Sequence, residues 1–200
     1  MSNAMRSVIL VSLLLTLLAG SASAIGHSHT RDGWVYALNL GWGWAKVTGH
    51  DTGNNLDMSS DWADDFTGGL RVGFAGSDNF SYGLDFSGWS DYGYQTRIKT
   101  WRILVTGTWY PKGQGFYLRG GIGGGSLGLE YTPVGFPKIS QSAGGLALGA
   151  GAGWEVRVSP GVAVGLAYDY YVVDSGTISY LDDVKTQTQG LTFSITWYTD

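Results

Sequence analysis

The three histidines of the chain, His27, His29 and His50, carry the side chains best suited to catalysis or metal binding. A histidine next to a serine can activate the hydroxyl as a nucleophile, as in hydrolases. His27 and His29 precede the first predicted strand and His50 falls in a predicted loop, so none lies beside a strand serine. The two histidines of His27-Ser-His29 are also fewer than the three or four ligands of a stable metal site. We therefore expect no enzyme activity, no cofactor and no metal centre.

Aspartates gather in two polar segments, where their oxygens could in principle bind calcium. Their spacing does not follow an EF-hand loop, so solvated surface charge is the better interpretation. The chain has no cysteine, which removes disulfides, zinc–thiolate sites and thiol nucleophiles. A net charge of −4 gives no reason to expect a nucleic-acid partner. The aspartates are Asp51, Asp57, Asp61, Asp64 and Asp65 in the first segment and Asp174, Asp182 and Asp183 in the second.

Seven other charged residues lie in segments where every second residue is apolar. The charged residues occupy the positions between the apolar ones. Folding the chain back at a turn near residues 77 and 78 brings Arg71 close to Asp85. A buried charge is costly unless it is paired, so we expect the seven to form one network inside the fold. An ion path or a substrate site is the functional alternative to this salt-bridged interior. The residues are Arg71, Asp85, Arg102, Arg119, Glu155, Arg157 and Asp169.

The elements that position these charges are predicted to be β-strands, because apolar residues recur at every second position and helical spacing does not appear. From Trp34 to Trp44, for example, large apolar residues alternate mostly with glycine and alanine. About eight such segments follow one another, and bacterial single-chain transmembrane barrels likewise have an even number of strands. They cover residues 34–44, 70–74, 80–87, 101–109, 116–122, 146–157, 162–170 and 191–198.

Two irregularities are expected within this pattern. The alternation slips across Gly123–Gly125, so that Leu127 and Leu129 fall on the polar face, and a glycine bulge would restore them to the apolar face. The connections alternate between short turns and long polar loops, as in outer-membrane barrels. The turns are expected at 76–79, 111–114 and 159–161, and the loops at 48–64, 90–97, 131–143 and 174–189.

The two faces of these strands indicate a barrel that is apolar on the outside. A soluble barrel would carry many lysines and glutamates on its polar face, whereas here that face holds small residues and a few charges of both signs. Ten residue steps from Trp34 to Trp44 correspond to roughly 25 Å of height at the usual strand tilt, which matches the apolar band of a membrane. An aromatic girdle is expected at Trp34, Trp42, Trp44, Trp101, Trp109, Trp154 and Trp197.

The beginning of the chain is predicted to be processing sequence. Residues 1–4 are interpreted as an expression scar ahead of a second methionine. Residues 5–24 have the basic start, apolar centre and Ala-Ser-Ala end of a signal peptide. Residues 25–200 are then one barrel domain, and past residue 24 no apolar run approaches the length of a transmembrane helix.

Together, the signal peptide, the eight alternating segments, the internal charges and the aromatic last strand Leu191–Tyr198 resemble the small outer-membrane β-barrel family that includes the OmpA transmembrane domain, OmpX, Ail and the opacity-type proteins. The resemblance spans Trp34 to Tyr198. It implies an eight-stranded antiparallel up-and-down barrel in the outer membrane of a Gram-negative bacterium, with outer-membrane lipid, lipopolysaccharide and the barrel-insertion machinery as partners. The family usually ends on an aromatic residue, whereas here Thr199 and Asp200 follow Tyr198.

The function expected from these observations is structural, or adhesive through four surface loops that contact an unknown ligand. A narrow channel for ions or small hydrophobic solutes, as in OmpW-like proteins, is the alternative. A soluble periplasmic ligand-binding barrel is a third hypothesis.

Overall fold

The computed structural model describes residues 31–92, 96–111, 115–131, 137–178 and 181–199. The scar at residues 1–4 and the signal peptide at 5–24 lie outside these residues and stay predictions. No helix within the described residues is long and apolar enough to span a membrane. The strands of the described chain are β1 (Gly33–Asp51), β2 (Leu56–Ser59), β3 (Ala63–Ser77), β4 (Phe80–Tyr92), β5 (Thr96–Trp109), β6 (Phe116–Tyr131), β7 (Ile139–Ser159), β8 (Val162–Ile178) and β9 (Leu181–Thr199).

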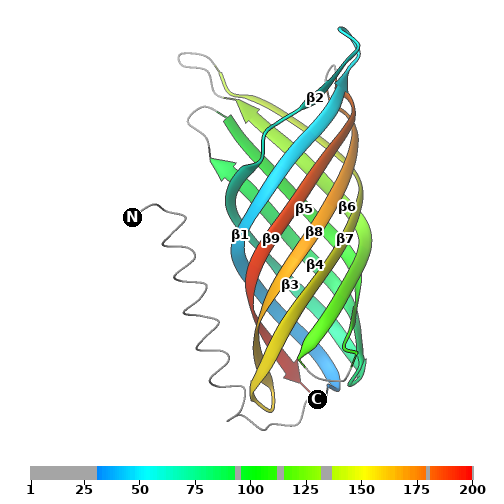
Figure 1. The fold of residues 1–200 in the computed structure, drawn as a ribbon, viewed down its shortest axis with the longest axis vertical. Coiled ribbons are helices and arrows are strands. Elements are labelled where there is room, and N and C mark those ends of the chain that lie inside the picture. Colours follow the sequence, from blue (N-terminus) through cyan, green and yellow to red (C-terminus); the bar gives the residue numbers. More distant parts are fainter. Residues whose placement is uncertain (1–30, 93–95, 112–114, 132–136, 179–180, 200) are drawn as a thin grey trace.

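The strands form one antiparallel sheet that closes on itself (Figure 1). From β3 onward each strand pairs with the next in the chain, and β1 pairs with both β3 and β9. The ring therefore has no free edge, and the strand backbone groups are paired without help from water. The predicted all-β, eight-stranded up-and-down barrel is confirmed for this ring, and the short β2 adds a ninth strand on the far end of β1.

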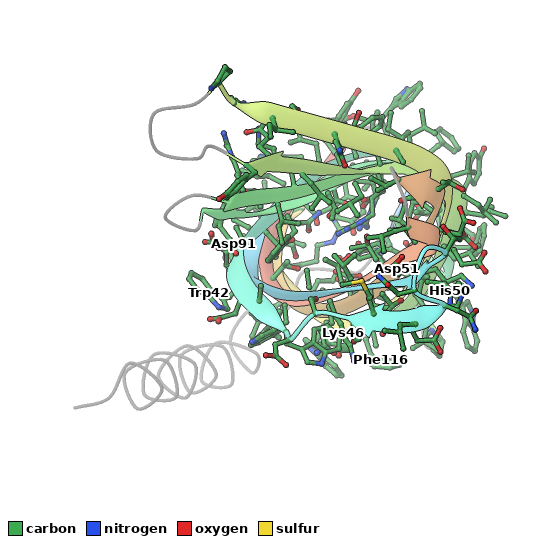
Figure 2. All side chains as sticks on the ribbon, turned by 90° about the horizontal axis from the view of Figure 1, so that it is seen from above. Trp42, Lys46, His50, Asp51, Asp91 and Phe116 are labelled. Carbon is green, nitrogen blue, oxygen red and sulfur yellow. The ribbon has the colours of Figure 1, made fainter. Side chains whose placement is uncertain are left out.

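Side chains alternate between the outside of the ring and its interior, as strand geometry requires. The exposed face is apolar: Leu84 is 56% exposed and Val105 61%. The interior face is mostly polar and holds buried serines, threonines, arginines and carboxylates. Viewed along the barrel axis, the interior is filled by side chains while Trp42 projects away from the ring (Figure 2).

The long polar loops predicted from the sequence are wrong in their extent. Residues 48–51, 139–143 and 181–189 belong to β1, β7 and β9, and residues 56–59 form the short β2, so the connections are shorter than expected. Backbone pairing accounts for the difference, because Thr48 pairs with Lys185 although neither residue is apolar. About 9 to 11 residues suffice to cross a membrane, whereas β7 has 21, so the strands stand well beyond the bilayer at this end.

The opposite end of the barrel carries the short turns. Strands β3 and β4 are separated by residues 78 and 79, and β7 and β8 by residues 160 and 161, as predicted. The start of β1 and the end of β9 lie at this same end (Figure 1). In outer-membrane barrels the short turns are periplasmic, so the extended strands point outward from the cell.

The predicted glycine bulge in β6 is also wrong. Strand β6 pairs with β5 and with β7 through residues 123–125 without a change of register. Leu127 therefore stays on the interior face, where it is fully buried. The interior side chains change from polar to apolar toward the outer end of the barrel. An apolar residue at an inward-facing position is therefore consistent with its surroundings there, and no bulge is needed to turn it outward.

Candidate functional site

The centre of the barrel interior holds the predicted pair of Arg71 and Asp85. The two residues face each other across the β3–β4 pairing, with Arg71 Nη2 3.4 Å from Asp85 Oδ2. Both side chains are buried. Among the described residues Asp85 Oδ1 has no protein hydrogen-bond donor. A cavity of about 20 Å³ beside it has room for one water molecule, which would supply that bond.

A second ion pair forms across an intervening strand. Arg119 Nη1 on β6 lies 3.6 Å from Asp169 Oδ1 on β8, and the residue between them on β7 is Gly151. A Cβ atom at Gly151 would collide with Asp169 Oδ1. The glycine therefore leaves the space in which two charges from non-adjacent strands meet.

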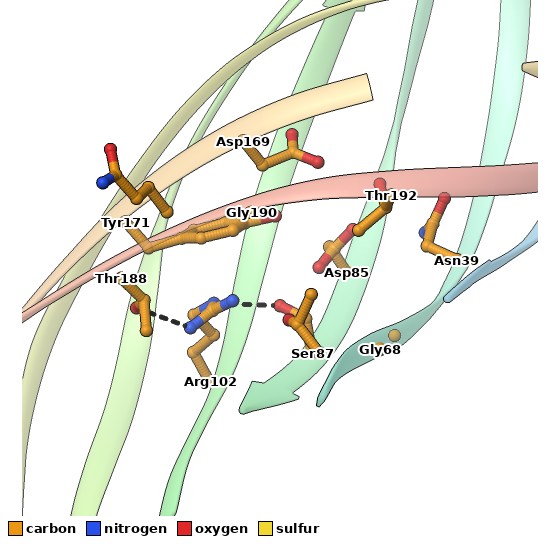
Figure 3. A pocket seen from close by; sticks show the side chains of 13 residues that line it. Asn39, Gly68, Asp85, Ser87, Arg102, Asp169, Tyr171, Thr188, Gly190 and Thr192 are labelled. Carbon is orange, nitrogen blue, oxygen red and sulfur yellow. Dashed lines mark hydrogen bonds between the residues drawn. The ribbon is translucent and has the colours of Figure 1, made fainter. Parts of the chain in front are cut away.

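Arg102 on β5 is held by hydroxyl groups and an aromatic ring. Its Nε donates to Ser87 Oγ and its Nη1 to Thr188 Oγ1, each at 3.0 Å (Figure 3). Its guanidinium carbon lies 3.5 Å from the centre of the Tyr171 ring, a cation–π contact. Asp85 lines the same small cavity but does not form a salt bridge with Arg102.

The periplasmic end of the interior is closed around Glu155. Arg31 Nη2 lies 2.9 Å from Glu155 Oε1, and the Tyr198 hydroxyl donates to the same oxygen at 2.8 Å. The Tyr110 hydroxyl donates to Oε2 at 3.4 Å, and the Arg31 guanidinium stacks on the Tyr110 ring. Arg31 also donates to the backbone carbonyl of Asp78 in the β3–β4 turn. This cluster ties the chain that precedes β1 into the barrel.

Direct contacts join the interior charges in groups, and Arg71 and Arg102 also interact electrostatically with both Asp85 and Asp169. That all seven form one network stays a prediction. Glu155 pairs with Arg31, and Arg157 donates to the Pro160 carbonyl and stacks on the Tyr198 ring. Sequence reasoning missed Arg31 because it stands before the first apolar residue of β1. Its position nevertheless matches the inward parity of Val35, so extending the alternation toward the N-terminus would have found it.

The outer end of the interior is closed by apolar side chains. Leu127, Ile178 and Val184 are buried there against one another. Their position beyond the Arg102 level follows from the register, because Leu127 pairs with Thr100, two residues outward from Arg102. The residues packed around this outer apolar cluster are Val47, Ile98, Leu129, Ala143 and Leu181.

The tryptophans of the predicted girdle lie on the outer surface in two bands. The band at the short turns includes Trp109 beside Phe80 and Trp154 beside Phe116. At the other end, Trp42 lies beside Phe66, and its Nε1 donates to Asp64. Six of the seven are about half exposed and Trp44 is partly buried; the six are Trp34, Trp42, Trp101, Trp109, Trp154 and Trp197.

The histidine and acidic side chains do not form a metal site within the described chain. His50 Nδ1 lies 2.9 Å from the exposed Asp57 on the β1–β2 hairpin. In the described ranges no group of three or more histidine or acidic side chains is arranged to hold a metal ion. His27 and His29 lie outside the described residues.

One ion cluster lies on the outer wall of the extended strands. Glu130 Oε1 accepts from Lys99 Nζ at 2.7 Å, and Oε2 lies 3.0 Å from Lys138 Nζ. These two bonds lower the pKa of Glu130 from its usual 4.5 to about 2. Because the folded-state pKa is below the unfolded one, the contribution to stability is present above pH 4.5 and is lost as the pH falls toward 2.

We expect the Glu130 side-chain carboxyl carbon to titrate near pH 2 in an NMR experiment on the folded barrel in micelles. Lys99→Gln removes one of the two donors and should move the midpoint upward. A midpoint near 4.5 in the unmodified protein would show that the lysines do not contact this carboxylate in solution.

A closed antiparallel ring with an apolar outer face, two tryptophan bands and charged groups inside defines a transmembrane barrel of the bacterial outer membrane. The sequence comparison agrees. The family model of the outer membrane protein beta-barrel domain matches residues 10–197, and the chain belongs to this family. Among curated proteins, none has a sequence that matches the chain significantly.

Two solved structures illustrate the shared fold. Neisserial surface protein A is similar with a TM-score of 0.57 at 14% identity, over 84% of this chain and all of that one (100%). Ail, the attachment invasion locus protein of Yersinia pestis, in complex with the heparin analogue sucrose octasulfate, is similar with a TM-score of 0.54 at 17% identity, over 82% of this chain and 99% of that one. At these identities the likeness concerns the fold.

Proposed function

We propose that the protein is a non-enzymatic outer-membrane barrel with a closed interior and a structural or adhesive role carried by its outer end. The observation that carries the proposal is the filling of the interior at three levels. Glu155 and its partners occupy the periplasmic end, the two ion pairs and Arg102 the middle, and the apolar residues around Leu127 the outer end.

The interior cavities support a closed barrel over a channel. Cavities of about 20 and about 10 Å³ lie beside Arg102 and beside Arg119, respectively. Each has room for about one water molecule. An ion that keeps part of its hydration shell needs a continuous wet path, and two cavities of this size, which share Asp169 and Tyr171 in their walls, have room for only a few water molecules.

Conductance across a planar lipid bilayer tests this proposal. We expect the purified barrel to insert without producing steady, discrete openings. Regular openings that change in size or selectivity with Arg102→Ala would favour the narrow channel instead, because that variant acts on the middle of the interior alone. The folded state of the protein used is verified by its faster migration in SDS gels before heating than after it.

An adhesive role would act through the outer strand ends, whose charge limits the choice of ligand. Acidic residues there outnumber basic ones, which disfavours a highly sulfated ligand of the kind bound to Ail and favours a neutral or cationic partner. The acidic residues are Asp51, Asp57, Asp61, Asp64, Asp65, Asp91, Glu130, Asp174, Asp182 and Asp183, and the basic ones are Lys46, Arg97, Lys99, Lys138 and Lys185.

The barrel-insertion machinery is proposed as a transient partner of the last strand. Trp197 faces outward, whereas Tyr198 is buried and bonded to Glu155 in the closed barrel. The Tyr198 ring is therefore available for recognition before the ring of strands closes, and Trp197 both before and after.

A further inference from the structure

The sheet opens on one side at the outer end of the barrel. Strand β3 pairs with β4 only as far outward as Thr67, which stands opposite Trp89. Beyond this level residues 63–66 of β3 still pair with β1, and residues 90–92 of β4 still pair with β5. The two segments do not pair with each other. The ring that is closed across the membrane is therefore split between β3 and β4 on its outer side.

The open edge continues from β3 into β2, which lies beside the outer end of β1 (Figure 1). Between these strands the Ser60 N–H donates to the Val47 carbonyl at 2.9 Å, so the connecting chain also pairs with β1. One residue of β1 then stands opposite residues 61 and 62, which is the geometry of a β-bulge. Residues 56–66 thus form one bulged strand edge, and among the described residues it pairs only with β1.

The side chains of this open edge are acidic or apolar, and none is basic. Sheet edges are commonly protected by lysine or proline, and residues 56–66 contain neither. The edge extends outward from Phe66, which lies beside Trp42 in the outer tryptophan band. The acidic residues are Asp57, Asp61, Asp64 and Asp65, and the large apolar residues, which are 43–61% exposed, are Leu56, Met58, Trp62 and Phe66.

Like charges account for the separation of β3 from β4. If their register continued outward, Asp91 would stand opposite Asp65, and like charges in that position destabilise a strand pair. Burial and the nearby Asp65 and Asp64 raise the pKa of Asp91, as expected for carboxylates that lie close together. The carboxylates that keep the two strands apart would attract a cationic partner.

The two faces of the open edge differ, and the difference sets the pattern of a matching strand. Asp51 of β1 is buried and so points inward, which places its partner Leu56 on the inward face and Asp57 on the outward one. Met58 shares the face of Leu56. A strand added to this edge would place cations beside Asp57 and apolar side chains beside Leu56 and Met58. Cations and apolar residues would therefore alternate in the partner.

The backbone of the open edge is oriented for strand pairing. Because the Ser60 N–H bonds to β1, the alternation of an antiparallel pair turns the N–H groups of Ser59 and Asp57 to the open side. At the other end of the edge, the Phe66 N–H donates to the side chain of its neighbour Asp65 at 2.7 Å, a local bond that a partner carbonyl could replace. An extended peptide supplies the alternating donors and acceptors that match this edge.

We propose that the open edge at residues 56–66 binds an extended segment of another protein, which adds to it as a strand and carries lysine or arginine at every second position. The proposal rests on the adhesive role proposed above and gives that role a cationic polypeptide as its partner. A sulfated glycan or a nucleic acid is repelled by the aspartates. A second copy of this chain would bring the same aspartates against one another, which disfavours self-association through this edge.

Binding of a synthetic peptide to the full barrel in nanodiscs of zwitterionic lipid tests the proposal. The probe is a fluorescent peptide of about eight residues, a common strand length, in which lysine alternates with threonine and valine. We expect its anisotropy to rise with the barrel and not with empty nanodiscs. Binding should be lost when glutamate replaces lysine, and also when alternate peptide nitrogens are methylated, which blocks strand pairing but keeps the charge. Equal binding of either modified peptide would overturn the proposal.

Two variants at one position test the backbone pairing. Ser59→Pro removes the N–H on the open side and should weaken peptide binding by about tenfold, as expected for the loss of one backbone hydrogen bond. Ser59→Ala removes only the hydroxyl and should bind as the unmodified protein does. Both are first shown to fold by heat-dependent migration in SDS gels. If the folded variants bind equally, the peptide does not add to this edge.

An NMR titration of the unmodified barrel gives the same test without a substitution. The amide signals of Asp57 and Ser59 should shift most when the lysine peptide is added, because their N–H groups turn to the open side. Bound peptide with both signals unmoved would place it elsewhere and overturn the proposal, whether or not Ser59→Pro folds.

A second pair of variants tests the charge. Asp61→Asn removes one charge from the open edge and should weaken binding by about threefold, as for one exposed ion pair. Asp174→Asn removes the same charge from an exposed position near the outer end of β8 and should leave binding unchanged. Equal effects would show that net charge alone attracts the peptide. A barrel that binds no peptide, or that dimerises without it, would mean that the aspartates only protect the edge, and the closed interior tested by conductance would be unaffected.

Discussion

Replacing Asp85 with alanine is expected to destabilise the folded barrel by about 3–5 kcal/mol, the usual cost of breaking a buried ion pair from one side. The variant leaves Arg71 buried with its Nη2 facing a space that held a carboxylate oxygen 3.4 Å away. Asp169, which also interacts electrostatically with Arg71 but is paired with Arg119, and the water in a cavity of about 20 Å³ are what remains to compensate that charge. The free energy of unfolding in urea, measured in lipid vesicles, gives the value.

Two further variants separate the loss of the pair from the loss of a charge. Asp57→Ala removes the same group from a side chain that is 96% exposed and should change stability little. Arg71→Leu combined with Asp85→Leu removes both charges and should recover most of the loss. A single variant Asp85→Ala as stable as the unmodified protein would mean that Arg71 reaches solvent, and the interior would then be wetter than the structure indicates.

Replacing Leu84 with lysine should destabilise the membrane-inserted barrel by about 2–4 kcal/mol, the cost of a lysine on the lipid face near the bilayer midplane. Leu84 is the immediate neighbour of Asp85 but points to the other side of the sheet. It lies between Val72 and Val105, in the middle of the apolar band. The measurement is the same urea titration in vesicles, together with the fraction of protein that folds into them.

The control for this variant places lysine outside the bilayer. Met58 on β2 is also an exposed apolar residue, but it lies at the outer end of the barrel, so Met58→Lys should be nearly neutral. Equal effects of the two lysines would contradict the assignment of the apolar face to lipid. Together, the substitutions at positions 84 and 85 test whether a charge is required on the interior face of the barrel and destabilising on its lipid-facing side.

The alternation of the sequence was sufficient to predict the strands, their faces and the membrane. Trp34 to Trp44 sets apolar residues outward at a period of two, and a one-residue slip would turn the whole set inward, so the pattern leaves one orientation for a barrel. The pair of Arg71 and Asp85 was predictable for a related reason, because a short turn between adjacent antiparallel strands fixes their register.

Contacts between distant strands were decided by the tertiary structure. Glu155 pairs with Arg31, 124 residues away, and Arg119 reaches Asp169 across Gly151 because the barrel curves and the glycine leaves room. The polar strand extensions, as in the pairing of Thr48 with Lys185, also depend on a neighbour that is already in register. Leu127 points inward because β6 keeps its register with both neighbours.

The sequence by itself therefore determined, outside the outer end of β6, which residues face lipid and which face the interior, because the side-chain period of a strand is local. The tertiary structure alone decided which interior groups meet and how far the strands continue. Those features depend on the stagger between strands and on the curvature of the closed ring, and neither is encoded in the period of any one strand.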